Sequence, residues 1–349
     1  MKLKKIGFVN ILEKKHKLNN KFKLTNETLR KADKKDLKIV SEIQDFCSSS
    51  KKKYKAFGGE WEYLNIVKRK KYINALLDNN LDRLVSFFSN LFRDNTSYGI
   101  VTPSYKDIKN KSKFKSQILQ DIDASIEFSK LNNSKQLEIN RNVGNPFGIL
   151  VGNNIIMPDA PRHYYFAHRI MKYAKYYKNF KLLEIGGGYG GLARILINSS
   201  KKITYFSIDL FEGCLIQYYF LKKVGLKVNL IKDVKNIKKN QINLILFDNN
   251  LKLLKKIGRC DLVFNSRSFS EMDGAILNKY LYLINNKIKP DYIYHENSNY
   301  LLYPKSKRHL EILGNDFRIN KKKYSLEFMN VSPFSGGSGR YREFFYKKI

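Results

Sequence analysis

The sequence predicts an α/β fold, in which a mostly parallel sheet in the C-terminal half follows a mainly helical N-terminal region. Two observations support this prediction. From about residue 180, short apolar runs alternate with segments of helical periodicity, a pattern typical of parallel strands joined by helices. Before residue 140, apolar residues recur mainly at helical spacing. We therefore expect a helical region over 1–140, a connecting loop and helix over 141–178, and a sheet domain over 179–349.

Composition is consistent with a folded protein and narrows the classes of partner. Hydrophobic residues make up 43% of the 349 residues, enough for a substantial core. The three cysteines are scattered, which argues against a disulfide framework or a zinc site and favours a cytoplasmic location. The net charge is +35, but the lysines are spread along the whole chain, so we expect no specific nucleic-acid partner. Peripheral contact with an anionic membrane fits this charge, whereas no apolar run is long enough for a transmembrane helix.

Three helical stretches are predicted before the sheet domain. They cover residues 25–46, 60–94 and 114–132. Thr25 is a candidate N-cap of the first, and Asn79-Asn80 breaks the second into a hairpin. The aromatic side chains of the second stretch, Trp61 among them, are interpreted as core residues. We expect these helices either to cover the active site or to form the surface of a homodimer.

A glycine-rich turn follows the first predicted strand of the sheet, Phe180–Ile185. Five of the six residues from Gly186 to Gly191 are glycines, and a helix then runs to about Asn198. A strand, turn and helix in this order present backbone N–H groups and the positive end of a helix dipole to a ligand. Glycine lets the backbone adopt positive φ and lets a ligand approach closely. The sequence therefore predicts a cofactor site at this turn.

Two cofactor patterns fit the turn. Gly186, Gly188 and Gly191 satisfy the G-x-G-x-x-G pattern of dinucleotide sites. Glu184 with Gly186, Gly188 and Gly190 satisfies E-x-G-x-G-x-G, which looks like the first motif of methyltransferases that use S-adenosyl-L-methionine (SAM). Glu184 favours the second pattern, because a carboxylate attracts an ammonium and a sulfonium but repels a pyrophosphate. We therefore predict SAM as the cofactor, with a nicotinamide or flavin as the alternative.

Polar residues follow the other predicted strands of the sheet. Strands are expected at 203–208, 261–264 and 292–294, with 227–231 and 242–247 as alternatives for the third strand and a final hairpin at 324–331 and 343–347. Asp209 ends the second strand, where a ribose-binding acid is expected. Asp248 or its neighbours would flank the adenine, and Asn265 and His295 follow the fourth and fifth strands. Because ligands bind beyond the carboxyl ends of parallel strands, these side chains should converge on one crevice.

Residues 145–349 resemble the class I SAM-dependent methyltransferases. More narrowly, they are similar to the sugar O-methyltransferases of bacterial surface-glycan gene clusters. The resemblance rests on Glu184–Gly190, on Asp209-Leu210 followed by Gln217-Tyr218-Tyr219, and on Asn265 through Ser268-Phe269-x-Glu271-Met272. It implies a Rossmann-like SAM methyltransferase domain, with a seven-stranded, mostly parallel sheet and a C-terminal antiparallel hairpin. Phe211 departs from the family, which has proline there, and this puts the local loop geometry in doubt.

The resemblance also implies roles for single residues. Those expected at the cofactor are Glu184, Gly186, Gly188 and Asp209, to which we add Gly190, Asp248 and Asn265. Asn265, Ser268 and Glu271 are expected to face the substrate. In these enzymes the helix before the first strand commonly lies over the cofactor, so His163, His168 and Arg169 are candidates for the substrate pocket.

The predicted reaction is methyl transfer to a sugar hydroxyl during synthesis of capsule or lipooligosaccharide. A hydroxyl is a weak nucleophile at neutral pH, so we expect His295 or Glu271 to act as general base. The acceptor could be nucleotide-linked, lipid-linked or polymeric. His295, Asp273 and Asp209 are conceivable metal ligands, but no ligand spacing demands a metal, and none is predicted.

Two further functions fit parts of the sequence. An RNA methyltransferase would use the positive charge for phosphate contacts and the many tyrosines for base stacking. No (D/N)PP(Y/F) motif follows the fourth strand, however, and Asn145-Pro146-Phe147 is interpreted as a turn. The other alternative is a non-catalytic scaffold with a SAM-type fold in a glycan assembly complex. Measured SAM binding and acceptor turnover would separate these alternatives.

Overall fold

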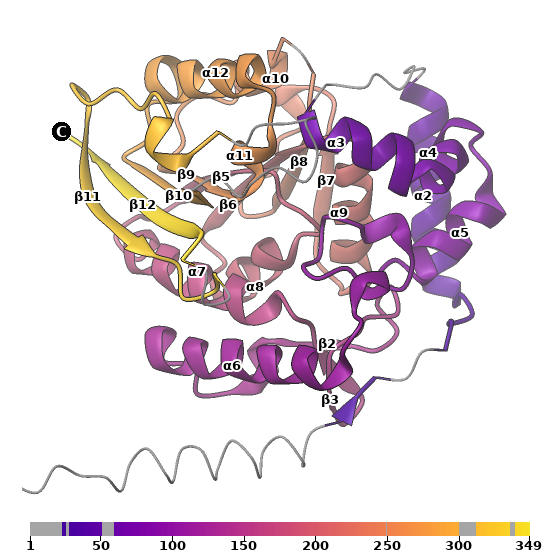
Figure 1. Ribbon diagram of the computed structural model, residues 1–349. Coiled ribbons are helices and arrows are strands. Elements are labelled where there is room, and N and C mark those ends of the chain that lie inside the picture. The colour runs from indigo at the N-terminus through magenta and orange to yellow at the C-terminus, as the bar shows by residue number, and fades with distance from the viewer. Residues whose placement is uncertain (1–22, 26–27, 51–58, 249, 300–311, 336–338) are drawn as a thin grey trace, which may run out of the picture.

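The computed structural model describes residues 23–25, 28–50, 59–248, 250–299, 312–335 and 339–349. In it, an eight-stranded sheet lies between two layers of helices, and the N-terminal helices pack at one side (Figure 1). A second, four-stranded sheet is small and antiparallel. Within the described residues, no helix is both long and apolar enough to cross a membrane.

The elements are as follows. The helices are α2 (Lys34–Ser50), α3 (Gly59–Tyr63), α4 (Lys70–Leu77), α5 (Leu81–Ser89), α6 (Lys111–Ser129), α7 (Ala160–Ala174), α8 (Gly191–Ser199), α9 (Phe211–Lys223), α10 (Lys252–Lys256), α11 (Ser268–Glu271) and α12 (Gly274–Leu283), with a π-helical turn at Leu64–Lys68. The strands are β1 (Lys23–Leu24), β2 (Glu138–Asn140), β3 (Ile149–Val151), β4 (Asn154–Ile156), β5 (Phe180–Ile185), β6 (Ile203–Asp209), β7 (Val228–Ile231), β8 (Ile242–Leu246), β9 (Leu262–Ser266), β10 (Tyr292–Ser298), β11 (Tyr324–Val331) and β12 (Tyr341–Lys348).

The large sheet has the strand order β11-β12-β10-β9-β5-β6-β8-β7. The six strands from β10 to β7 are parallel, and β12 runs antiparallel between β10 and β11, so the predicted C-terminal hairpin is present. The prediction of seven strands is wrong by one, because both alternatives for the third strand, β7 and β8, are strands. β7 is a half-exposed edge strand, which explains its less apolar sequence.

Strand residues alternate between two hydrophobic cores, one on each face of the sheet. Leu182 of β5 belongs to the core that includes Phe220 of α9. Its neighbours Leu183 and Ile185 belong to the core that includes Leu281 of α12. This two-residue period explains why the buried strands read as continuous apolar runs in the sequence. It also decides which residues at the strand ends can face a ligand.

Helix α2 begins at Lys34, nine residues after the predicted N-cap Thr25. The prediction is wrong because Asp33 and Asp36 cap the helix instead. Asp36 N donates to Asp33 Oδ1 over 2.9 Å, and Asp33 N donates to Asp36 Oδ2 over 2.8 Å. These reciprocal bonds satisfy two N–H groups that the first turn of a helix leaves free. Residues 26 and 27 lie outside the described part of the chain.

The N-terminal helices share a core with the sheet domain. The rings of Phe88 on α5 and Tyr219 on α9 lie 5.0 Å apart, and both residues belong to the core that contains the sheet residues facing α9. Lys223 of α9 is buried and lies 2.6 Å from both Asp33 and Asp36. This packing holds the N-terminal helices against α9, and it places α3 beside α11 at the carboxyl ends of the strands (Figure 1).

Candidate functional site

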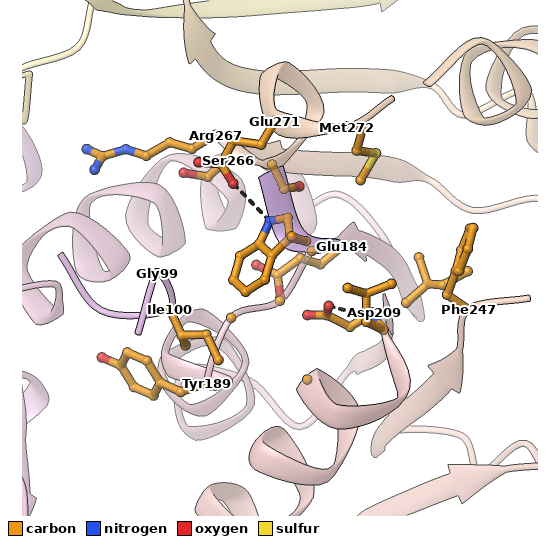
Figure 2. Close-up of a pocket in the computed structure, with 18 of the residues that line it drawn as sticks. Gly99, Ile100, Glu184, Tyr189, Asp209, Phe247, Ser266, Arg267, Glu271 and Met272 are labelled. Atoms are coloured by element: carbon orange, nitrogen blue, oxygen red, sulfur yellow. Dashed lines mark hydrogen bonds between the residues drawn. The ribbon is translucent and has the colours of Figure 1, made fainter. Parts of the chain in front are cut away.

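A pocket opens at the carboxyl ends of the parallel strands β5, β6 and β9, where the strand order reverses, because β6 lies on one side of β5 and the later strand β9 lies on the other. Ligands of open α/β sheets bind at this point. The pocket has about 1450 Å³ of empty space, open solvent included. Figure 2 shows Glu184 near its centre, with Glu271 on one side and Asp209 on another.

The glycine turn forms the floor of the pocket. Gly186 and Gly188 line it and have φ of +77° and +58°, a region that favours glycine. A Cβ at Gly186 would lie 2.2 Å from Ser268 Oγ, and one at Gly187 would lie 2.3 Å from Ser207 Oγ. Gly190 lies beneath, with φ of +90° at the N-cap of α8, and does not line the pocket. The backbone of the turn is therefore bare toward the pocket.

Two carboxylates, one buried and one half-buried, flank this turn. Glu184 Oε2 accepts a hydrogen bond from the Tyr205 hydroxyl over 2.5 Å, and burial raises the pKa of Glu184 to about 8. Asp209 Oδ2 accepts from Gln217 Nε2 over 2.9 Å, and Oδ1 accepts from Leu210 N over 2.8 Å. Burial raises the pKa of Asp209 to about 7 despite these bonds. Neither has a cation within ion-pair distance among the described residues, so a cationic or hydroxyl-bearing ligand would suit both.

The end of β9 supplies polar residues to the pocket wall. Ser268 lines the pocket, and the buried Asn265 lies behind it, with Nδ2 donating to Ser268 Oγ over 2.6 Å and to Ile185 O over 2.8 Å. Asn265 therefore joins the loops that follow β5 and β9 and is not among the lining residues. Glu271 lines the pocket, and its Oε2 accepts from Trp61 Nε1 over 3.0 Å.

The position of His295 does not support the prediction that it is a general base. Its side chain is fully buried and stacks on Phe344, with ring centroids 4.6 Å apart. It also packs on Phe317, and burial lowers the pKa of His295 to about 3. Successive strand residues point to opposite faces, so His295 points away from the pocket and Glu296 points toward its wall. Glu296 accepts from the lining residue Ser266 over 2.8 Å.

Helix α7 contributes three pocket residues, the apolar Phe166 and two polar ones, of which one was predicted and one was missed. His163 lines the pocket, and burial lowers its pKa well below the usual value, so the ring is neutral at pH 7. Arg162, which was not predicted, lines it too, and its Nη1 donates to Ser266 Oγ over 2.6 Å. His168 and Arg169 lie outside the pocket lining, and Arg169 instead pairs with Glu343, with Nε 3.6 Å from its Oε2.

Asp248 is not among the residues that line the pocket. Its carboxylate accepts from the backbone N–H groups of Asn250 and Lys252 at the start of α10, over 2.8 and 3.2 Å. The preceding residue, Phe247, lines the pocket beside Asp209 (Figure 2). The prediction named Asp248 or its neighbours, and the neighbour Phe247 is the residue that lines the pocket.

The N-terminal helices, which were expected either to cover the active site or to form a dimer surface, supply a wall of the pocket whose residues were not predicted. Trp61, Asn65 and Arg69 line the pocket. They occur four residues apart, and residues at this spacing lie on one face of a helix. A helix face that only packs in a core is usually apolar throughout. The polar residues Asn65 and Arg69 on the same face as Trp61 were therefore the sequence signal that this face lines a pocket. Trp61 was interpreted as a core residue, but it lies in the pocket.

Within the described residues, no group of three or more His, Cys, Asp or Glu side chains is arranged to hold a metal ion. Asp209 and Asp273 line the pocket, whereas His295 does not, so the three conceivable metal ligands named above are not brought together.

No family model matches the sequence, and no curated protein matches it. Solved structures do match. The small RNA methyltransferase HEN1 is 15% identical with a TM-score of 0.38 over 52% of this chain, and the chain spans 25% of the HEN1 chain. The mitomycin 7-O-methyltransferase MmcR is 12% identical with a TM-score of 0.38 over 90% of this chain and 94% of its own. An O-methyltransferase family protein from Burkholderia thailandensis is 8% identical with a TM-score of 0.37, over 54% and 59%. The function proposed below rests on the residues of the pocket.

Proposed function

We propose that the protein is a SAM-dependent O-methyltransferase. The observation that carries the proposal is the pairing of two carboxylates, the buried Glu184 and the half-buried Asp209, with a bare glycine turn in one pocket at the switch point of the sheet. This set fits the groups of SAM. Glu184 would hold the ammonium, Asp209 would accept from the ribose hydroxyls, and the backbone of Gly186 to Gly188 leaves room for close approach.

A nicotinamide or flavin dinucleotide fits the pocket less well. Its pyrophosphate would lie on the glycine turn, where Glu184 and Asp209 are both within the pocket lining. Removing solvent strengthens repulsion between like charges, so two carboxylates here disfavour a dianionic group. The apolar side chains of Phe247, Ile276 and Tyr280 in the lining suit a flat adenine in either case and do not discriminate.

Bound SAM would supply an electrophilic methyl group on sulfur. The chain's part is to position an acceptor oxygen in line with that group and to remove its proton. Positioning alone contributes roughly 7–11 kcal/mol in well-oriented systems. Glu271 is our candidate for the base, because it lines the pocket and the indole N–H of Trp61 fixes one of its oxygens. A positioned base contributes about 10²- to 10⁴-fold.

We propose a sugar hydroxyl in surface polysaccharide synthesis as the acceptor. Near Glu271, the lining offers the polar groups of Ser266 and Tyr341 together with the ring of Trp61, and Thr102 also lines the pocket. Hydroxyl groups need several donors and acceptors, whereas the C–H face of a sugar ring needs an apolar surface. This combination supports a sugar more than an apolar phenol, which would need fewer hydrogen-bonding partners.

Trp61 makes the proposal simple to test, because it is the only tryptophan in the sequence. Its emission, excited at 295 nm, should change on binding S-adenosylhomocysteine and should not change with NAD. A screen with methyl-labelled SAM should then show transfer to a sugar acceptor, and Glu271→Gln should lose about 10²- to 10⁴-fold in kcat while still binding S-adenosylhomocysteine. Absence of binding would refute the proposal and favour a scaffold. Labelling of RNA with a steep salt dependence would identify the acceptor as RNA instead.

A further inference from the structure

The helical wall of the pocket contains a buried arginine, Arg69, which has no part in the proposed reaction. The π-helical turn Leu64–Lys68 ends at Arg69, whose N–H donates to Leu64 O, five residues back, over 2.9 Å. Such turns are rare and frequently occur at functional sites. The turn contains Asn65 and is followed by Arg69, and both side chains line the pocket.

A chain of hydrogen bonds fixes Arg69 in place. Its Nε donates to Thr96 O over 2.9 Å, and its Nη1 donates to Asn65 Oδ1 over 2.9 Å. Asn65 Nδ2 in turn donates to Glu212 Oε1 over 2.5 Å. Arg69, Asn65 and Glu212 are each only 1% exposed. Among the described residues, nothing accepts a hydrogen bond from Arg69 Nη2, although that nitrogen is buried.

A buried guanidinium nitrogen without an acceptor is costly, so a ligand oxygen at this point would be stabilising. The surroundings decide the chemistry of that oxygen. Asp209 and Glu212 line the same pocket, so one cation stands among two carboxylates. A phosphate or a carboxylate would meet net negative charge there. A neutral ligand fits Arg69, Asp209 and Glu212 together if its hydroxyl groups donate to the carboxylates and one of its oxygens accepts from the guanidinium. A vicinal diol has this chemistry.

We propose that Arg69 is a further binding residue of the cofactor site, and that its Nη2 donates to a ribose hydroxyl oxygen whose own proton is donated to Asp209. Asn65 acts as a positioning residue, because it holds both Arg69 and Glu212. This inference rests on the proposed function, since it takes the ligand to be SAM. It assigns part of cofactor recognition to the N-terminal helices, outside the sheet domain.

The test compares S-adenosylhomocysteine with its 2′-deoxy and 3′-deoxy analogues by calorimetry, in the full-length chain and in Arg69→Gln. Arg69→Gln should weaken S-adenosylhomocysteine roughly 10- to 100-fold, the range for a lost charged hydrogen bond. For the analogue that lacks the contacted hydroxyl, the same substitution should cause less than a threefold loss. Arg69→Lys should lose less affinity for S-adenosylhomocysteine than Arg69→Gln does, with the same dependence on the analogue. This second variant keeps the test valid if Arg69→Gln folds poorly.

Arg93→Gln is the matched control. Arg93 is also buried, donates to the carbonyls of Asn145 and Pro146 and does not line the pocket, so this variant should lose stability but keep the wild-type affinity. If both Arg69 variants weaken all three ligands by the same factor, Arg69 has only a structural role and the inference is refuted. If the wild-type chain does not bind S-adenosylhomocysteine at all, the proposed function fails first, so the two failures are distinguishable.

Discussion

The binding of S-adenosylhomocysteine should depend on pH through Glu184. Burial raises the pKa of this carboxyl to about 8, so most copies of the free protein hold it protonated at pH 7. An ammonium ligand needs the ionised form. With a pKa of about 8, the ionised fraction is about one tenth at pH 7 and about one hundredth at pH 6, and the apparent Kd rises by the inverse of that fraction. We therefore expect the Kd to fall about tenfold from pH 6 to pH 7.

Calorimetry in two buffers of different ionisation enthalpy would measure both the Kd and the proton released on binding. Glu184→Gln should bind more weakly and lose most of this pH dependence. The Kd of the wild type for methylthioadenosine, which lacks the ammonium, should also lose most of its pH dependence. In the variant and with methylthioadenosine, the pH dependence that remains should come from Asp209, whose pKa is about 7. A wild-type Kd that is constant between pH 6 and 7.5, or a Glu184→Gln variant with an unchanged slope, would refute the reasoning.

Three further predictions concern stability. Lys223→Met should reduce the free energy of unfolding by about 1.5–3 kcal/mol in urea titrations, because it removes one of the two cations, Lys223 and Arg30, that contact the buried Asp36; a loss below 1 kcal/mol would contradict this. Gly190→Ala should cost more than Gly225→Ala, since both have positive φ but only at Gly190 would a Cβ meet a side chain, 3.0 Å away; thermal unfolding compares them. For His295→Phe we expect near-wild-type turnover. The pKa of His295 is about 3 in the folded state and 6.5 in the unfolded state, so acid favours unfolding of the wild type. The variant lacks this group and should therefore lose less stability than the wild type between pH 6.5 and pH 4.

The sheet and the cofactor turn could be predicted because their signals are local. The run Phe180–Ile185 and the glycines after it determine a strand, a turn and a helix within a few residues, and β5 has the predicted bounds. Asp209 followed from the position of a strand end. Asp248 and His295 show where such reasoning stops, because a shift of one residue along a strand reverses the face.

The residues of the N-terminal wall were harder to predict, because the polar Asn65 and Arg69 at helical spacing from Trp61 were their one local signal. Trp61 at helical spacing looks the same whether it packs in a core or covers a pocket, and only the packing of these helices on α9 distinguishes the two. Arg162 was missed for a related reason. Its neighbour His163 seemed the more informative residue, whereas the structure places both in the pocket lining.

The pocket takes its walls from distant parts of the chain, since Trp61 precedes the sheet and Tyr341 begins its last paired strand, β12. This order matters during synthesis. A nascent chain can pack its first helices against α9 as soon as α9 has left the ribosome, but the pocket lacks its final wall until β12 has emerged. The complete pocket therefore forms only in the finished chain. A bound cofactor would stabilise that chain by an amount that grows with its concentration relative to Kd, so newly made protein should gain stability with the cellular supply of cofactor.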